Sequence, residues 1–144
     1  MAGSTDLRYS SKTRGNLCIG VHTDVEVTDA PCENRQLVSQ AFCSALPVAY
    51  TPVPAHYWPA FSSVVLEAAY EATMWSAVLN ARRGASKVVL LTLLGGGAFG
   101  NEDEWILSAM RRGLELLSSF DIDVRIVSYG QRSPALLGLA KDFG

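Results

Sequence analysis

Hydrophobic and polar positions divide the first part of the chain into an arm and three short elements. Residues 17–22 and 24–28 are typical of strands, because apolar and polar residues alternate along the second segment. Residues 35–46 carry apolar residues at helical spacing and predict a helix, which ends at Pro47 because proline cannot continue it. Residues 1–15 are polar and predict a flexible N-terminal arm, so that one domain spans residues 16–144.

A long amphipathic helix and a buried strand follow in the middle of the chain. Pro59 suits the first turn of a helix that runs to about Arg83, with Gly84 placed to end it. Residues 87–94 form a nearly continuous apolar run, which predicts a central strand covered on both faces. The helix repeats its apolar residues at helical spacing and predicts a core-facing stripe of Phe61, Val65, Ala68, Ala69, Ala72, Trp75 and Leu79.

The last third of the chain continues the alternation of strands and helices. Asn101 is a suitable N-cap and Glu104 stands three residues later, close to the capping-box spacing, before a helix with a regular apolar stripe. Residues 121–129 predict another strand, and residues 134–141 predict a short helix. This alternation predicts an α/β fold, a three-layer α/β/α sandwich with a mostly parallel central sheet.

Composition narrows the class of protein. The chain has 144 residues, of which 49% are hydrophobic and 18% charged, with a formal net charge of −2. This balance argues against a nucleic-acid backbone or an anionic membrane as the main partner, and no apolar run reaches the roughly 18 residues that a membrane span needs. Cys18, Cys32 and Cys43 are odd in number and lack C-x-x-C spacing, which argues against a disulfide framework or a zinc ribbon. We therefore expect a reduced intracellular protein, cytoplasmic or nuclear.

The junction between the apolar strand and the following helix carries the strongest candidate site. Four glycines occupy the six positions from Gly95 to Gly100, so backbone N–H groups can approach an anion, and the helix turns its positive end toward it. Glycines at such a junction also serve tight turns and close packing alone, and that alternative stays open. Ligands of parallel sheets bind beyond the carboxyl ends of the strands, where Tyr129 either stacks on a base or covers the core.

The glycine loop also matches the dinucleotide-binding expression G-x-G-x-x-G through Gly95, Gly97 and Gly100. A Rossmann unit places this motif after its first strand, with an acidic residue at the end of the second strand. Here the next strand ends at Ser128 and Tyr129, and the chain after Gly100 is too short for the remaining strands. No Gly-Lys-Ser/Thr sequence follows. The loop therefore predicts neither a dinucleotide-dependent dehydrogenase nor a P-loop protein.

Residues 88–101, the pair Trp105-Ile106 and residues 124–130 resemble the C-terminal half of a macrodomain, in particular the macrodomain-like modules related to poly(ADP-ribose) glycohydrolases. In that family a G-x-G-[AV]-[FY]-G loop wraps the diphosphate of ADP-ribose. The resemblance implies a macrodomain-like fold in which the loop backbone contacts phosphate, Phe99 lies against the distal ribose and the region of Tyr129 borders the adenine pocket. The ligand-binding residues that it implies are Gly95, Gly96, Gly97, Ala98, Phe99, Gly100, Asn101 and Tyr129.

Several elements of that family have no counterpart before Gly95. The chain lacks the acidic residue for adenine, the Asn-Ala-Ala-Asn-like stretch and a second glycine-rich loop, which implies a fold shortened at its N-terminus, replaced elements or a second chain that supplies them. Binding of ADP-ribose or a related nucleotide diphosphate is the first interpretation, with ADP-ribose or an ADP-ribosylated protein as the partner and a homodimer as one way to complete the sheet. An ADP-ribosyl hydrolase and an interaction or scaffold domain with a structural glycine loop are the alternatives. No residue is assigned to catalysis, and neither a cofactor nor a metal is expected.

Three other groups of residues are weaker candidates. His22 and Asp24 suit a base with its orienting carboxylate or part of a metal site, but a solvated pair has the same pattern. Glu67 and Glu71 lie on one face of the long helix, where paired carboxylates serve acid–base chemistry or are simply solvated. Cys43 has no histidine nearby in sequence, so a buried structural thiol is favoured over a nucleophile.

Overall fold

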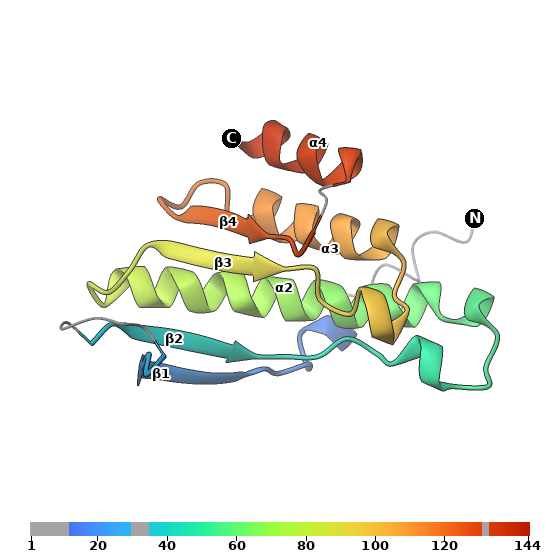
Figure 1. Cartoon of the computed structure of the whole chain (residues 1–144). Coiled ribbons are helices and arrows are strands. Elements are labelled where there is room, and N and C mark those ends of the chain that lie inside the picture. Colours follow the sequence, from blue (N-terminus) through green and yellow to red (C-terminus); the bar gives the residue numbers. More distant parts are fainter. Residues whose placement is uncertain (1–11, 30–34, 131–132) are drawn as a thin grey trace.

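The computed structural model describes residues 12–29, 35–130 and 133–144 as a mixed α/β arrangement (Figure 1). Its strands form two separate small sheets, and its helices lie mainly in the second half of the chain. Short 3-10 turns occur at Val48–Tyr50 (η1), Ala55–Tyr57 (η2) and Gly97–Phe99 (η3). The main elements are β1 (Gly20–Glu26), β2 (Leu37–Phe42), α2 (Pro59–Arg82), β3 (Val88–Thr92), α3 (Asp103–Leu116), β4 (Asp123–Val127) and α4 (Pro134–Phe143).

The two sheets differ in direction and lie along the same helix. β1 pairs with β2 in an antiparallel hairpin, whereas β3 pairs with β4 in a parallel ladder that α3 connects. Helix α2 runs along both sheets and contacts a strand of each, with β3 along one side of it and β2 along the other (Figure 1). The parallel pair and its crossover helix confirm the α/β class that the alternating pattern predicts.

The core lies between α2, α3 and one face of the parallel pair. Leu91 is 3% exposed and Val89 packs against the same cluster, whereas Leu90 is 61% exposed and Val88 40% exposed. The prediction that this strand is covered on both faces is therefore wrong within the described residues. An apolar strand is buried on a given face only where another element packs against that face. The described elements pack against one face of this strand.

Helix α2 has the predicted bounds, but its predicted core-facing stripe is only partly buried: Ala68 and Ala69 are buried as expected. Proline occupies its first turn, and the helix ends at Arg82. Of the predicted stripe, Phe61, Trp75 and Leu79 are 52%, 39% and 62% exposed. The helix carries apolar residues around most of its circumference, so their spacing does not single out one face. The side chains that it buries are those of Ser62, Leu66, Ala68, Ala69, Tyr70, Met74 and Val78.

The predicted helix at residues 35–46 is wrong, because residues 37–42 form β2. Val25 pairs with Val38 and His22 with Gln40, and the register shifts by a bulge between these pairs. Asp24 lies in the bulge with a φ of 56°, a left-handed conformation that aspartate tolerates better than most residues. Pairing with β1 outweighs the local helical spacing, since strand formation depends on partners more than on intrinsic preference.

Ion pairs attach the segment before β1 and the helix α3 to α2. Arg14 donates to Glu67 over 2.5 Å, and Arg112 lies 3.6 Å from Glu67 and 3.8 Å from Glu71. The carboxylate pair on the long helix therefore takes part in a half-buried ion-pair cluster. Residues 1–11, most of the predicted arm, lie outside the described residues, as does Cys32. In the part of the chain that the structure describes, no helix has the length and apolar character needed to cross a membrane.

Candidate functional site

The glycine loop and the segment of Tyr129 follow neighbouring strands at the same edge of the parallel pair. Thr92 at the end of β3 is the register partner of Val127 at the end of β4. Residues 95–101 and 128–130 therefore both lie beyond the carboxyl ends of the strands, where α/β sheets bind their ligands. The Tyr129 side chain is fully exposed, so it does not cover the core.

Two glycines of the loop are required by close packing. Gly95 has a φ of 79°, and a Cβ there would overlap the Cβ of Ala45 and stand 2.7 Å from the Asn101 side-chain nitrogen. Gly100 has a φ of 71°, and its Cβ would stand 2.9 Å from the Cβ of Ala49. These contacts hold the loop against the chain that follows β2. The packing alternative for the glycine run therefore has direct support at these two positions.

Gly97 differs from its neighbours because it faces open space. It has a φ of 66°, yet an added Cβ there would meet no atom within 4 Å. The N–H groups of Gly97 and Ala98 come before the first backbone bond of η3 and have no hydrogen-bond partner among the described residues. Gly97 and Ala98 are also exposed. Two adjacent unpaired amides at an exposed turn can donate to an anion.

Asn101 closes the loop and does not cap the helix, so the predicted N-cap is wrong. Its side-chain nitrogen donates to the carbonyl oxygens of Leu46 (2.8 Å) and Gly95 (3.2 Å), and the residue is 5% exposed. Helix α3 starts two residues later at Asp103. The Asn101 Oδ1 atom is buried and has no hydrogen-bond partner among the described residues.

Carboxylates occupy the start of α3. The N-cap position is Glu102, and Asp103 and Glu104 stand in the first turn. Acidic residues at this end already interact favourably with the positive end of the helix dipole. They repel a second anion, so the helix end does not favour phosphate in the way the sequence suggests. Any anion at this loop depends on the amides of Gly97 and Ala98.

Aromatic contacts around the loop include one residue that sequence reasoning did not assign to the site. The rings of Phe99 and Tyr50 meet edge to face with centroids 6.1 Å apart. Tyr50 ends η1 and is 69% exposed, so its ring stands beside the loop and is open to a ligand. Tyr50 lies far from residues 95–101 in the sequence, so no local motif links it to the loop.

Tyr70 joins α2 to the end of β3, just before the glycine loop. Its hydroxyl donates to the Thr92 carbonyl oxygen over 2.7 Å and accepts from the Leu94 N–H over 3.0 Å. The residue is 4% exposed. Burial raises the pKa of Tyr70 to about 12, although the hydrogen bond from Leu94 acts in the opposite direction. This phenol therefore remains protonated, and its two hydrogen bonds hold the start of the glycine loop in place.

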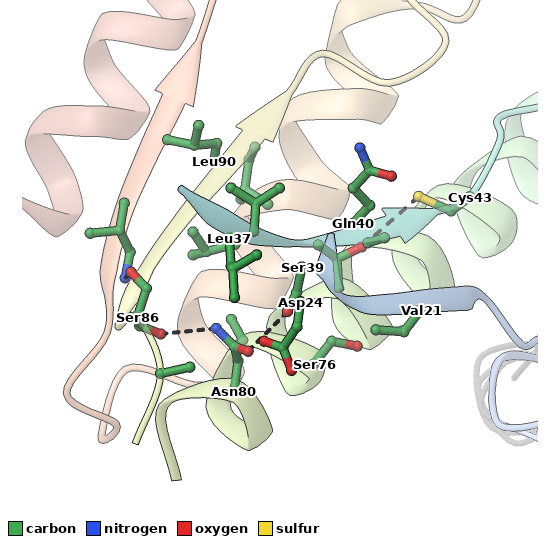
Figure 2. Close-up of a pocket in the computed structure, with 18 of the residues that line it drawn as sticks. Val21, Asp24, Leu37, Ser39, Gln40, Cys43, Ser76, Asn80, Ser86 and Leu90 are labelled. Atoms are coloured by element: carbon green, nitrogen blue, oxygen red, sulfur yellow. Dashed lines mark hydrogen bonds between the residues drawn. The ribbon is translucent and has the colours of Figure 1, made fainter. Parts of the chain in front are cut away.

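A groove between β2 and β3 is the second candidate site, and no sequence motif predicts it. It encloses about 510 Å³ and has α2 as its floor. Leu37 of β2 and Leu90 of β3 stand on opposite sides, as Figure 2 shows, while Thr73 and Ser76 come from the floor. The two walls come from segments about fifty residues apart, and no short motif connects them.

A polar cluster closes one end of the groove; we call Asp24, Ser39, Asn80 and Arg83 the clamp. The Arg83 guanidinium donates to both Asp24 carboxylate oxygens at 2.7 Å. Ser39 Oγ donates to Asn80 Oδ1 at 3.0 Å, and Figure 2 shows these two residues at this end of the groove. The bond from Arg83 holds the pKa of the Asp24 carboxyl below its usual range. Asp24 is thus bound to arginine, which leaves no support for it as the orienter of His22.

Neither site has a metal centre or a known relative that identifies it. Among residues 12–29, 35–130 and 133–144, no three or more His, Cys, Asp or Glu side chains are grouped to hold a metal ion. The chain matches no protein-family model, no curated protein and no solved structure. The function must therefore be argued from the two sites themselves.

Proposed function

We propose that the chain binds ADP-ribose or a related nucleotide diphosphate at the glycine loop that follows β3. The observation that carries this proposal is the pair of unpaired, exposed amides at Gly97 and Ala98, beyond the carboxyl end of a parallel strand pair. Backbone N–H groups in this position suit phosphate oxygens because they donate without a side chain in the way.

Aromatic side chains near the loop support a nucleotide more than a free phosphate. Tyr50 stands against Phe99 with its ring largely exposed, and Tyr129 extends from the neighbouring strand end without cover. Such rings suit a base or a ribose face. The phosphate sits on the amides of Gly97 and Ala98, away from the carboxylates at the start of α3.

The proposal includes the specific fold that the resemblance implies, a three-layer macrodomain-like sandwich. In that fold a further layer covers the exposed face of β3 and β4. The exposed apolar side chains on these strands support such a layer, since Val88 is 40%, Leu90 61% and Val127 48% exposed. It also includes an intracellular location, cytoplasmic or nuclear, and ADP-ribose or an ADP-ribosylated protein as the partner. A second copy of the chain is one source of the missing layer.

An interaction domain with a structural glycine loop is the second candidate. The observation that favours it is the packing of Gly95 and Gly100 against Ala45 and Ala49, which explains both glycines without a ligand. The carboxylates Asp103 and Glu104 in the first turn of α3 favour it as well, because they repel anions. The two candidates therefore differ most directly in the role of the open turn at Gly97 and Ala98.

Two substitutions at Gly97 separate the candidates. Aspartate and asparagine both tolerate a positive φ, and an added Cβ meets open space, so Gly97→Asp and Gly97→Asn should both fold. They differ only by a negative charge beside the amides. In titration calorimetry with ADP-ribose, we expect Gly97→Asp to weaken binding by about tenfold or more and Gly97→Asn to weaken it by much less.

The calorimetry has a clear contrary result. Absence of heat with the unaltered chain at high ADP-ribose concentration contradicts the binding proposal and leaves the interaction domain. Equal affinities of Gly97→Asp and the unaltered chain for ADP-ribose would show that the ligand binds somewhere other than this loop. Release of ADP-ribose from a modified protein by the same sample would add the hydrolase activity to the binding function.

A further inference from the structure

Two strand edges face each other across the groove above α2. β2 pairs only with β1 and β3 only with β4, so no ladder joins β2 to β3 in the described part of the chain. The two strands point in the same direction along α2 (Figure 1). An unpaired strand edge presents N–H and C=O groups that favour pairing with another strand. Here two such edges border one groove.

The register of β3 shows which backbone groups point into the groove. Asp123 N–H donates to the Lys87 carbonyl oxygen over 3.0 Å, so Lys87 and Val89 direct their backbone groups toward β4. The backbone of Leu90 then points toward the groove. At the two ends of this edge, Ser86 Oγ accepts the Val88 N–H and Tyr70 donates to the Thr92 carbonyl. Among the described residues, nothing pairs with the N–H and C=O of Leu90.

The register of β2 leads to the same result on the opposite wall. Val27 N–H donates to the Gln36 carbonyl oxygen over 2.9 Å, and Val25 is the register partner of Val38. In an antiparallel ladder the residue between two bonded positions turns its N–H and C=O outward, and here that residue is Leu37. Its backbone groups have no partner within the described ranges.

The floor and the charges of the groove restrict what can fill it. The central floor residues Thr73, Ser76 and Ala77 are small, so side chains that point at α2 must also be small. Asp24 and Arg83 are the charged residues along the lining, and they neutralise each other in the clamp. An uncharged occupant therefore fits better than a charged one.

The β1–β2 hairpin itself lacks cover. No residue of β1 or β2 is buried, and Leu37 and Phe42 are each 58% exposed. A two-stranded hairpin is marginally stable in water, whereas a wider sheet packed on a helix is stable. A strand placed between β2 and β3 would join the hairpin to the parallel pair as one sheet over α2.

We propose that the groove binds an extended, uncharged segment of a separate polypeptide, which pairs with β2 and β3 as a strand between them. Only an extended backbone presents N–H and C=O groups on both of its edges, as Leu37 and Leu90 require. A folded strand of a second copy does not fit, because each of β1 to β4 already pairs along one edge. The segment carries small side chains toward α2 and alternates them with residues that face outward beside Leu90.

The test uses the full chain and a library of random dodecapeptides displayed on phage, from which the most enriched peptide is synthesised. Leu90→Pro removes the N–H that points into the groove but no bond of the β3–β4 ladder, whereas Leu90→Ala keeps that N–H. We expect Leu90→Pro to weaken peptide binding by about tenfold and Leu90→Ala by much less, the effect of one hydrogen bond. Gly97→Asp is expected to bind the peptide normally, which separates this site from the glycine loop.

Two further measurements test the proposal even if Leu90→Pro disturbs β3. Ala77→Trp fills the groove from the helix side and should abolish peptide binding while the helix content stays the same by circular dichroism. In hydrogen exchange followed by NMR, the amides of Leu37 and Leu90 should exchange more slowly with bound peptide, while those of Val89 and Leu91 stay unchanged. Failure to select any peptide overturns the proposal, and so does equal binding by Ala77→Trp. Protection of Leu90 that appears with chain concentration alone assigns the groove to a second copy instead.

Discussion

The glycine loop and the groove share β3, yet they arise in different ways. The loop is a continuous stretch of sequence whose shape depends on glycine and on contacts with Ala45 and Ala49. The groove is formed by β2, β3 and α2, which meet only after the chain has folded. In the loop, packing explains two of the glycines, and the N–H groups of Gly97 and Ala98 lack a hydrogen-bond partner within the described residues. In the groove, the outer edges of two strands lack a partner in the same part of the chain. The recognisable sequence motif therefore belongs to the smaller binding surface, and the larger one has no motif.

The largest effect should separate the packing glycines of the loop from the open one. Gly95→Ala combines a φ of 79° with an overlap onto Ala45, so we expect it to lower the free energy of unfolding by about 3 kcal/mol. At Gly97 the φ is also positive, but an added Cβ meets no atom within 4 Å. We therefore expect Gly97→Ala to lower the free energy of unfolding by about 1 kcal/mol. Urea denaturation of both variants measures the difference. Equal losses would mean that Ala45 does not hold the loop in place.

The next effect concerns Tyr70, which belongs to both regions. It lines the groove and also fixes the loop through Thr92 and Leu94. Tyr70→Phe keeps the ring and removes both hydrogen bonds, so we expect a loss of about 1–2 kcal/mol in the free energy of unfolding. Urea denaturation tests this, with Tyr57→Phe as a control because the Tyr57 ring is 69% exposed. A loss no larger than that of the control would contradict the linking role.

How much of this could be read from the sequence depends on whether a feature is local. The bounds of α2, the strand at residues 88–92 and the crossover to β4 follow from local period and from proline and glycine signals. The strand β2 does not, because its pairing with β1 overrides helical spacing. The buried face of α2 was predicted correctly at Ala68 and Ala69 but not in the second half of the helix, since Trp75 and Leu79 fit the helical period as well as the buried residues there do.

The same distinction explains the candidate sites. Gly95–Asn101 stood out because its composition is unusual, but sequence could not separate Gly95, which packs, from Gly97, which is open. Asn101 had the chemistry of a cap, yet the fold brings Leu46 to its side chain. The groove had no local signature, because Leu37 and Leu90 are ordinary strand residues whose unpaired edges appear only once the sheets are assembled.

An effect of similar size should appear at alkaline pH. The pKa of Tyr70 is raised to about 12 in the folded chain, while an unfolded tyrosine titrates near 10. The unfolded chain therefore loses this proton first, and the stability that Tyr70 contributes is full below about pH 10 and falls as pH rises toward 12. In this window we expect the free energy of unfolding to fall more steeply for the unaltered chain than for Tyr70→Phe, by up to about 1.4 kcal/mol per pH unit. Denaturation at matched pH values measures it, and parallel curves would contradict it.

The smallest effect tests the clamp that holds the hairpin beside the groove. Arg83 lowers the pKa of Asp24, so the pair contributes its stability above the ordinary aspartate pKa of about 3.9 and loses it as pH falls through the lowered value. Asp24→Asn keeps a side chain that tolerates the φ of 56° and removes the charge. At neutral pH the hairpin amides Val25 and Val27 should exchange faster in Asp24→Asn, by less than about tenfold because exposed ion pairs are weak. Comparing hydrogen exchange at neutral pH and below pH 3 checks the direction, since the two proteins should converge in acid. A difference that persists there would show that the shape of the bulge, rather than the ion pair, holds the hairpin over α2 and keeps the groove open.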